Sequence, residues 1–266
     1  TYIMHMLIFP SLLELYAFLL YFFCSLYRHS CVGAPKEVLL GCRNLDSVTS
    51  TEWQKPQKPL VQDGDILVIT SKIVALAESR TFTARNEEEK IRYIEAESTW
   101  HTRTKYVHLS IKDGMPMASA GIDESNGDGK CIMLPENSYE SAYHIWLTLR
   151  EKYLFANLGI IITDSHTVPF RKWTTGVSLG HMGFSGVKSY VGKPDIFGRP
   201  FAFSKVNIVD ALATAAVHTM GEWDECQPLA IIRNPHVTYT EERQNGDDLI
   251  IAPEDDMYGP LFISRV

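Results

Sequence analysis

The sequence predicts an α+β fold built around a mixed sheet. Three short apolar runs, residues 65–70, 159–163 and 228–234, have the length and composition of buried strands. Two longer segments, residues 137–153 and 207–221, space their apolar residues for one helical face. Because strands and helices do not alternate strictly along the chain, a mixed sheet is favoured over a doubly wound parallel sheet.

The first sixty residues are the least typical of a globular domain. Residues 3–27 hold one charged residue, Glu14, and are long enough to cross a bilayer. Their composition is compatible with a buried or dimer-covered helix, with a membrane anchor, or with a segment foreign to the catalytic fold. We expect an apolar helix outside the catalytic core. We therefore divide the chain into an apolar leader and connector (1–60), a catalytic domain (61–240) and an acidic C-terminal tail (241–266).

The first half of the catalytic domain contains three further predicted elements. Residues 71–80 are compatible with either a helix or a strand. Residues 84–101 form a polar helix in this prediction, with a few apolar residues on one face. Residues 106–122 are expected to form a hairpin that turns at Asp113-Gly114, because Asp-Gly between apolar runs favours a tight turn.

The second half begins and ends with helices whose boundaries have recognisable signals. Asn137 and Glu140 resemble a capping box at the start of the helix 137–153. Gly221 is placed to end the helix 207–221. Between the two helices, residues 176–198 are rich in glycine and are expected to form a loop.

Composition excludes one class of function and indicates a compartment. The chain has 266 residues, of which 45% are hydrophobic and 21% charged, as in ordinary globular proteins. Its net charge of −7, without a block of Lys and Arg, argues against a nucleic-acid surface. Its five cysteines are scattered and form no CxxC pair, which favours free thiols in a reducing, cytoplasmic compartment.

The segment NLGIIITDSH, residues 157–166, runs from an apolar strand into Asp164 and Ser165. A carboxylate there needs a partner, because burying an unpaired charge is costly. The partner is either a helix N-terminus, with Asp164 or Ser165 as the N-cap, or a metal ion or phosphate at the carboxyl end of the strand.

Two other stretches suit a cation. The loop 121–130 offers oxygen ligands of the kind that Mg²⁺ or Mn²⁺ prefers, although an Asx-rich turn has the same composition. These oxygens belong to Asp123, Glu124, Asn126 and Asp128. Glu222 follows a predicted helix end, where the helix dipole disfavours negative charge, so it is either a solvated loop acid or a cation ligand.

Several segments, taken in order, closely resemble the coenzyme F420-0:L-glutamate ligases. They are GDILVITSKIVALAESR, AGIDESN, LGIIITDS, GKPDIFGRPF and VDALATAAVHTMGE followed by QPLAIIRN, spread over about residues 62–234. The resemblance implies a homodimer of mixed-sheet subunits, each with two lobes around a metal and nucleotide cleft. It also implies a ligase that uses GTP and Mg²⁺ or Mn²⁺. Such an enzyme joins L-glutamate, through its amine, to the carboxylate of a deazaflavin coenzyme F420 precursor by way of an acyl phosphate.

The resemblance also implies roles for individual residues. The implied metal ligands are Asp123, Asp164, Ser165 and Glu222, and the two aspartates are also the implied catalytic residues. The implied nucleotide contacts are Thr70, Ser71, Lys72, Asn126, Met220, Gly221 and Arg171. We expect the three carboxylates to form one cluster, with their oxygens within about 6 Å of one another, so that they share a cation.

Two departures from the family pattern affect the nucleotide site. Leu76 stands where the family commonly has a nucleotide-binding Lys, and Val168 stands where it often has an Arg. We expect Lys72, Arg171 and Lys172 to compensate in part. The alternatives are a related amide ligase with another acid or amine, a metal- or nucleotide-binding homologue without catalysis, and a membrane-tethered form that uses residues 3–27.

Overall fold

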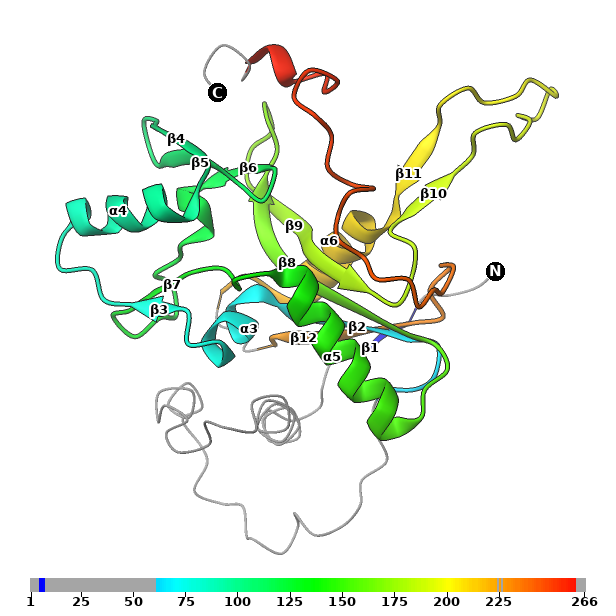
Figure 1. Cartoon of the computed structure of the whole chain (residues 1–266), viewed down its shortest axis with the longest axis horizontal. Helices are drawn as coiled ribbons and strands as arrows, with labels where there is room; N and C mark the ends of the chain where they lie inside the picture. The colour runs from blue at the N-terminus through cyan, green and yellow to red at the C-terminus, as the bar shows by residue number, and fades with distance from the viewer. Residues whose placement is uncertain (1–4, 8–60, 224, 226, 262–266) are drawn as a thin grey trace, which may run out of the picture.

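The core of the molecule is a five-stranded mixed sheet with the order β1-β12-β2-β8-β9 (Figure 1). The computed structural model describes residues 5–7, 61–223, 225 and 227–261. β2 (Asp65–Thr70) and β8 (Leu158–Thr167) are parallel neighbours, whereas β12 (Leu229–Arg233) is antiparallel to β2 and β9 (Thr174–Met182) is antiparallel to β8. The predicted α+β class with a mixed sheet is confirmed.

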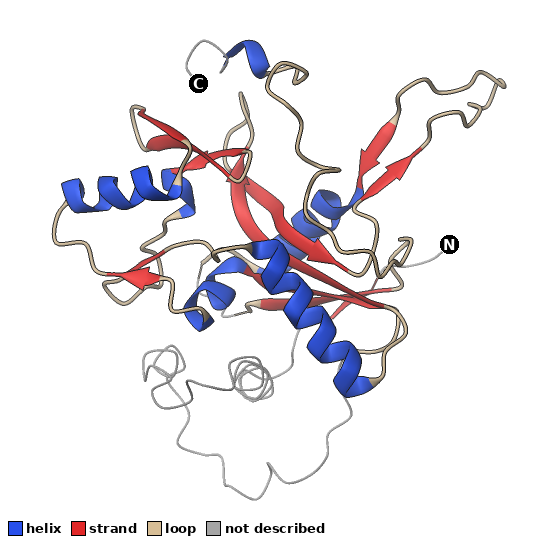
Figure 2. Ribbon diagram, viewed as in Figure 1, coloured by secondary structure: helices blue, strands red, loops and turns tan. Residues whose placement is uncertain are grey.

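Two helices cover opposite faces of this sheet, which gives three layers (Figure 2). On one face, α5 (Ser138–Tyr153) packs its apolar side against Leu67 and neighbouring sheet residues. On the other face, α6 (Ile208–Met220) packs against Ile66 and Val68. Successive residues of a strand point to opposite faces, so the central residues of β2, Ile66–Ile69, must all be apolar. Burying one such side chain stabilises the fold by about 1.5–3 kcal/mol.

The start of α5 matches its sequence signal, and α6 begins with a side-chain cap of the same kind. The Asn137 side chain accepts hydrogen bonds from the N–H groups of Tyr139 and Glu140, and the Asn207 side chain accepts one from Asp210. The Glu140 carboxylate is paired with Arg243. The reciprocal half of the expected capping box is thus replaced by an ion pair to the C-terminal segment.

A smaller unit lies beside the sheet between β2 and α5. It begins with α3 (Ser71–Ala77), which settles the open prediction for residues 71–80 as mainly helix. It continues with β3 (Thr81–Phe82), α4 (Glu87–Glu97), β4 (Trp100–Arg103), β5 (His108–Lys112), β6 (Met115–Ala118), a 3-10 turn η2 (Ser119–Gly121) and β7 (Cys131–Ile132). The predicted turn at Asp113-Gly114 is confirmed, and both residues have positive φ, as a tight hairpin turn requires.

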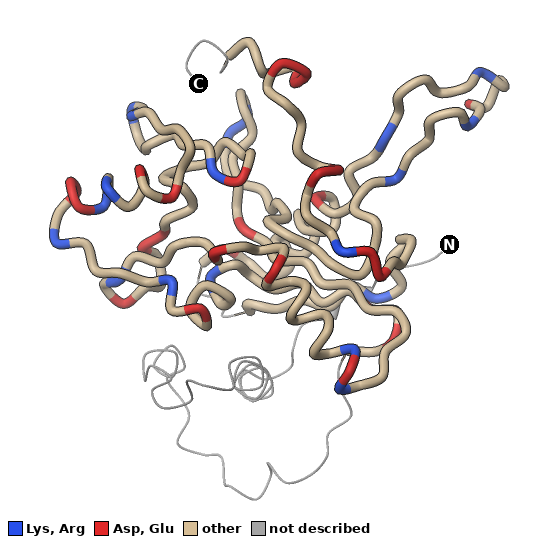
Figure 3. The backbone as a smooth tube through the Cα atoms, viewed as in Figure 1, with Lys and Arg blue, Asp and Glu red and all other residues tan. Residues whose placement is uncertain are grey.

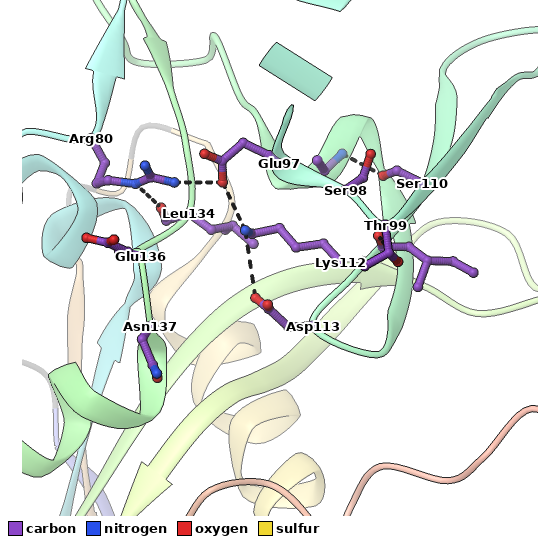
Figure 4. A network of polar contacts seen from close by, with 12 residues as sticks. Arg80, Glu97, Ser98, Thr99, Ser110, Lys112, Asp113, Leu134, Glu136 and Asn137 are labelled. Atoms are coloured by element: carbon purple, nitrogen blue, oxygen red, sulfur yellow. Dashed lines mark hydrogen bonds and ion pairs between the residues drawn. The ribbon is translucent and has the colours of Figure 1, made fainter. Parts of the chain in front are cut away.

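A network of partly buried charges ties this unit together (Figure 4). Glu97 Oε2 accepts hydrogen bonds from Arg80 Nη2 at 2.6 Å and from Lys112 Nζ at 2.9 Å. Arg80 Nε also donates to the carbonyl oxygen of Leu134, just before α5. Burial alone would raise the pKa of Glu97, but the two cations reverse this effect and lower it. The network therefore joins α4 and β5 to the chain segment that leads into α5.

Two of the predicted secondary-structure elements are wrong. Residues 3–27 were expected to form one helix, but His5–Leu7 form strand β1 at the edge of the sheet, antiparallel to β12. The rest of that segment lies outside the described residues. Residues 176–198 were expected to be loop, yet they include most of β9 and all of β10 (Val187–Ser189). Gly176 in β9 permits close packing on α6, because a Cβ atom there would lie 2.7 Å from Val217 Cβ.

β10 pairs with β11 (Lys205–Asn207) to form the base of an arm, residues 187–207, that projects from the sheet (Figure 1).

The described C-terminal segment runs back over the molecule to the 3-10 turn η3 (Gly259–Leu261), and Glu241 in it pairs with Arg150 of α5 at 2.7 Å. Among the residues that the structure describes, no helix has the length and apolar composition needed to cross a membrane. The boundaries placed at residues 60 and 240 stay predictions.

Candidate functional site

Asp164 and Ser165 lie within a strand. β8 does not end at Thr163 but continues to Thr167 and turns back as β9. The alternative in which Asp164 or Ser165 caps a helix is therefore wrong. The pairing of β8 with β9 shifts register between Ile162 and Thr163, immediately before Asp164. Such irregularities redirect side chains and are common next to active sites.

The loop 121–130 is held by a lysine from the start of α3. Lys72 Nζ donates to Asp123 Oδ2 at 2.7 Å, to the carbonyl oxygen of Ser125 at 2.9 Å and to Ser125 Oγ at 3.1 Å. The Asp123 carboxylate also accepts the Ser125 N–H at 2.8 Å and the Ser125 hydroxyl at 2.6 Å. Burial alone would raise the pKa of Asp123, but these hydrogen bonds lower it. Asp123 is thus an ionised and well-satisfied carboxylate.

Asp164 differs from Asp123 because its local partners are weaker. Burial raises the pKa of Asp164 to about 6. The hydrogen bond from the Ser165 N–H and the positive charge of Lys72 lower the pKa and offset only part of this rise. The negative charges of Asp123 and Glu222 raise the pKa further. Asp164 therefore lies within electrostatic reach of both other carboxylates that the sequence singled out, although the three come from different segments of the chain.

Glu222 completes this group from the end of α6. Burial raises the pKa of Glu222, while a hydrogen bond to the Ser165 side chain and the charge of Lys72 oppose the shift. The preceding Gly221 has a φ of +85°, and a Cβ atom there would lie 2.2 Å from the carboxyl carbon of Glu225. Only glycine fits this position without a rearrangement. Gly221 therefore fixes how the chain turns from α6 toward Ser165.

The two acidic loops also touch directly. Asn126 Nδ2 donates to the carbonyl oxygen of Trp223 at 3.1 Å, and Trp223 N donates to Glu225 at 2.8 Å. The loop of Asp123 and the loop of Glu222 are thus in contact with each other. The structure brings together Lys72, Asp123, Asn126, Asp164, Ser165, Gly221 and Glu222.

The other predicted nucleotide residues are placed less centrally. Thr70 ends β2, and the buried Ser71 begins α3 beside Lys72. Met220 is buried at the end of α6. Arg171 lies in the turn between β8 and β9, where its N–H donates to the carbonyl oxygen of Val168. No contact within the described part of the chain joins Arg171 to the carboxylate group.

The expected three-carboxylate metal cluster is not formed in this conformation. Across the described residues, no three His, Cys, Asp or Glu side chains are arranged so that they could hold a metal ion. The contacts explain why, because Lys72 and Ser125 bind the Asp123 oxygens while Ser165 binds Glu222. The carboxylates are electrostatic neighbours, and their side chains are directed to other partners.

Comparison with known proteins identifies the family. The sequence model of the F420-0:gamma-glutamyl ligase family matches residues 43–234. The chain belongs to this family. It is 32% identical to the coenzyme F420:L-glutamate ligase of Methanococcus maripaludis, over 74% of this chain and 86% of that protein. The protein of the same name from Methanocaldococcus jannaschii is 31% identical over the same shares, and that of Methanosarcina mazei is 35% identical over 65% of this chain and 75% of that protein.

Sequence reasoning missed two residues that shape this family member's site. Ser125 binds both Asp123 and Lys72, and Glu225 braces the loop after Gly221. Ser125 lies two residues after Asp123, the spacing of a local Asx turn, so a signal for it was present. Glu225 had no such signal, because its role depends on the turn that follows α6.

Proposed function

We propose that this chain is a ligase that joins L-glutamate, through its amine, to the carboxylate of a deazaflavin coenzyme F420 precursor, using GTP and a divalent cation. The observation that carries the proposal is that Lys72 binds Asp123 at 2.7 Å while the charges of both residues act on Asp164 and Glu222. The relatives carry the name coenzyme F420:L-glutamate ligase, which supports the choice of glutamate and of the coenzyme.

The donor atoms are of the kind that Mg²⁺ or Mn²⁺ prefers, although the described side chains are not arranged around a common point in this conformation. Asp123, Asp164 and Glu222 offer carboxylate oxygens and Ser165 offers a hydroxyl, which are ligands that hard cations prefer. Burial and mutual repulsion raise the pKa of Asp164, so added positive charge would favour its ionised form. A bound cation would offset the repulsion between the triphosphate and the substrate carboxylate.

The proposed reaction has two steps. Transfer of the γ-phosphoryl group of GTP to the substrate carboxylate gives an acyl phosphate and GDP. The glutamate amine then attacks the acyl carbon, which forms the amide and releases phosphate and a proton. Asp123 and Asp164 are the proposed catalytic residues, and Lys72 supplies a cation for the phosphates.

Neutral groups near the carboxylates are the remaining proposed nucleotide contacts. They are Thr70 and Ser71 at the junction of β2 and α3, Asn126 in the acidic loop, and Met220 with Gly221 at the end of α6. Arg171 would have to reach the phosphates from the turn between β8 and β9. The sheet with α5 and α6, and the smaller unit of residues 71–132, would be the two lobes of the cleft.

A homodimer through the arm of residues 187–207 is also part of the proposal. Ile196, Phe197 and Phe203 on the arm are 86–92% exposed, an unusual amount of apolar surface to leave in water. The arm carries four basic residues and one acidic residue on a chain whose net charge is −7 (Figure 3). A second copy of the chain therefore offers the arm a surface of complementary charge. Phe197→Ser with Phe203→Ser should shift the molar mass measured by light scattering toward the monomer.

Product analysis tests the ligase. The full chain is incubated with GTP, Mn²⁺, L-glutamate and the deazaflavin precursor, and the precursor is followed by mass spectrometry. We expect it to gain one or more glutamyl residues while GDP forms. Asp123→Asn should abolish the product, whereas Asp128→Asn, an exposed residue of the same loop, should not.

Other outcomes separate the alternatives. GTP turnover with a different acid or amine, and none with the deazaflavin precursor, would indicate a related amide ligase. Binding of Mn²⁺ and a GTP analogue without turnover on any acid would indicate a homologue that has lost catalysis. Failure to bind nucleotide at millimolar concentration would show that Lys72 and Arg171 do not compensate for Leu76 and Val168, and would contradict the GTP-dependent reaction.

A further inference from the structure

The Lys72 ammonium is fully engaged with the acidic loop. An ammonium has three N–H donors, and Lys72 Nζ has three oxygen partners: Asp123 Oδ2 at 2.7 Å, the Ser125 carbonyl oxygen at 2.9 Å and Ser125 Oγ at 3.1 Å. One of these oxygens belongs to a proposed cation ligand, and the other two lie two residues further along the loop. The ammonium thus takes the same kind of oxygen donors that a hard cation requires.

The charge of Lys72 also reaches the other two carboxylates. It lowers the pKa of Asp164 and of Glu222, although burial leaves both pKa values above their usual range. One ammonium therefore partly neutralises three carboxylates. A cation at Asp123 and the Lys72 ammonium could not share this place without strong repulsion, because two positive charges would lie within a few ångströms.

We propose that Lys72 is a positioning residue that competes with the divalent cation for Asp123 and thereby couples cation binding to nucleotide binding. Before the cation binds, Lys72 holds the acidic loop in place. Cation binding releases the ammonium from Asp123, and an anionic phosphate is the partner that then satisfies it. This inference rests on the proposed function, since it assigns an order and a coupling to binding at the same site.

The coupling has a definite thermodynamic form. If a phosphate compensates the displaced ammonium, nucleotide must tighten cation binding, and the cation must tighten nucleotide binding by the same factor. If Lys72 only contacted phosphate, its removal would weaken nucleotide binding but would leave the affinity for the cation alone unchanged. The two possible roles of Lys72 therefore predict different cation affinities for a Lys72 variant in the absence of nucleotide.

The chain provides a matched control on the same loop. Lys90 Nζ of α4 pairs with Glu124 Oε1 at 2.7 Å, the same distance as in the Lys72–Asp123 pair. Glu124 directly follows Asp123 in the acidic loop, but the proposed cation ligands are Asp123, Asp164, Ser165 and Glu222. Lys90→Met thus removes a lysine–carboxylate contact of the same length from the loop without removing the one that is proposed to compete with the cation.

The test measures Mn²⁺ binding to the full chain by electron paramagnetic resonance of the free ion, with and without a non-hydrolysable GTP analogue. Without the analogue, Lys72→Met should bind Mn²⁺ at least about tenfold more tightly than the parent, because one charge-assisted contact no longer opposes the cation. The analogue should tighten Mn²⁺ binding to the parent and to Lys90→Met, and much less to Lys72→Met. Lys72→Gln, which keeps a neutral donor, should fall between the parent and Lys72→Met.

Unchanged or weaker Mn²⁺ binding by a folded Lys72→Met, with circular dichroism like that of the parent, would overturn the inference. Equal tightening by Lys90→Met would also overturn it, since the effect would then be general loop electrostatics. Tighter Mn²⁺ binding by Lys72→Met, together with a parent chain that forms no glutamyl product, would support the competition and contradict the proposed ligase. The two ideas can therefore fail separately.

Discussion

Two aspartates at opposite ends of neighbouring strands in the same sheet show how differently one side chain can be used. Asp65, at the start of β2, is 1% exposed and accepts two hydrogen bonds from the Arg233 guanidinium, at 3.0 and 2.9 Å, and one from the Gln62 N–H at 2.8 Å. Asp164, in the second half of the parallel neighbour β8, has the Ser165 N–H and the charge of Lys72 in its favour, yet its pKa rises to about 6.

The difference separates structure from function within one sheet. A buried carboxylate with a two-pronged arginine partner is satisfied by the fold itself and needs nothing further. A carboxylate whose pKa is raised by burial and by neighbouring negative charge costs stability, and such groups cluster at functional sites. Asp65 therefore belongs to the scaffold, whereas Asp164 belongs to the candidate site.

The largest change in stability is expected when the partner of Asp65 is removed. Arg233→Ala should lower the free energy of unfolding by about 3–5 kcal/mol, because it leaves the Asp65 charge buried without its main partner. Urea unfolding would measure it. Arg85→Ala, which removes an exposed i,i+4 pair with Glu89, should have no measurable effect. Equal stability of Arg233→Ala and the parent would contradict the assignment of Asp65 and Arg233 to the structural scaffold.

The network of Figure 4 offers an intermediate case. Glu97→Gln should destabilise the fold by about 2–3 kcal/mol, because Arg80 and the nearly buried Lys112 lose the charge they share. Since the folded-state pKa of Glu97 is lowered, its contribution is complete above about pH 4.5 and is lost as the pH falls through the lowered pKa. Thermal unfolding from pH 7 to pH 3 would show it.

Glu95→Gln, on the same helix, is the control for this experiment. Its side chain is 52% exposed and lies 3.6 Å from His101. Its effect should be well below that of Glu97→Gln. If the two substitutions behave alike, the Glu97 network does not hold the smaller unit together.

The smallest effect is expected at Asp164, and with the opposite sign. In the presence of a chelator at pH 7.5, Asp164→Asn should raise the free energy of unfolding by about 1–2 kcal/mol, a value reduced for partial solvent screening. Because its folded-state pKa is raised from 3.8 to about 6, the parent should lose stability as the pH rises between these values. The variant should lack this slope, as denaturant unfolding across pH 4–7 would show.

Asp164→Asn should also weaken Mn²⁺ binding if the carboxylate is a ligand. A variant that is less stable than the parent at pH 7.5 would mean that Asp164 is satisfied much as Asp65 is. That result would remove the difference between the two ends of the sheet. A gain in stability together with a loss of Mn²⁺ binding would support the distinction between Asp65 and Asp164.

The sequence by itself determined the elements whose causes are local. The buried run 65–70, the helix start at Asn137, the helix end at Gly221 and the turn at Asp113-Gly114 follow from residues a few positions apart, and all appear in the structure. The family resemblance also pointed to Asp123, Asp164 and Glu222, which the fold brings within electrostatic reach of one another.

Only the tertiary structure decided what those carboxylates bind. Lys72 and Asp123 are 51 positions apart, and no periodicity or spacing indicates that they are paired. The strand at His5–Leu7 and the length of β8 likewise depend on pairing with distant strands. Hydrogen-bond partners, burial and pKa values are set by which segments the fold brings together, whereas helix and turn signals act within a few residues. That is why the candidate residues could be named from the sequence, while the competition for Asp123 could not.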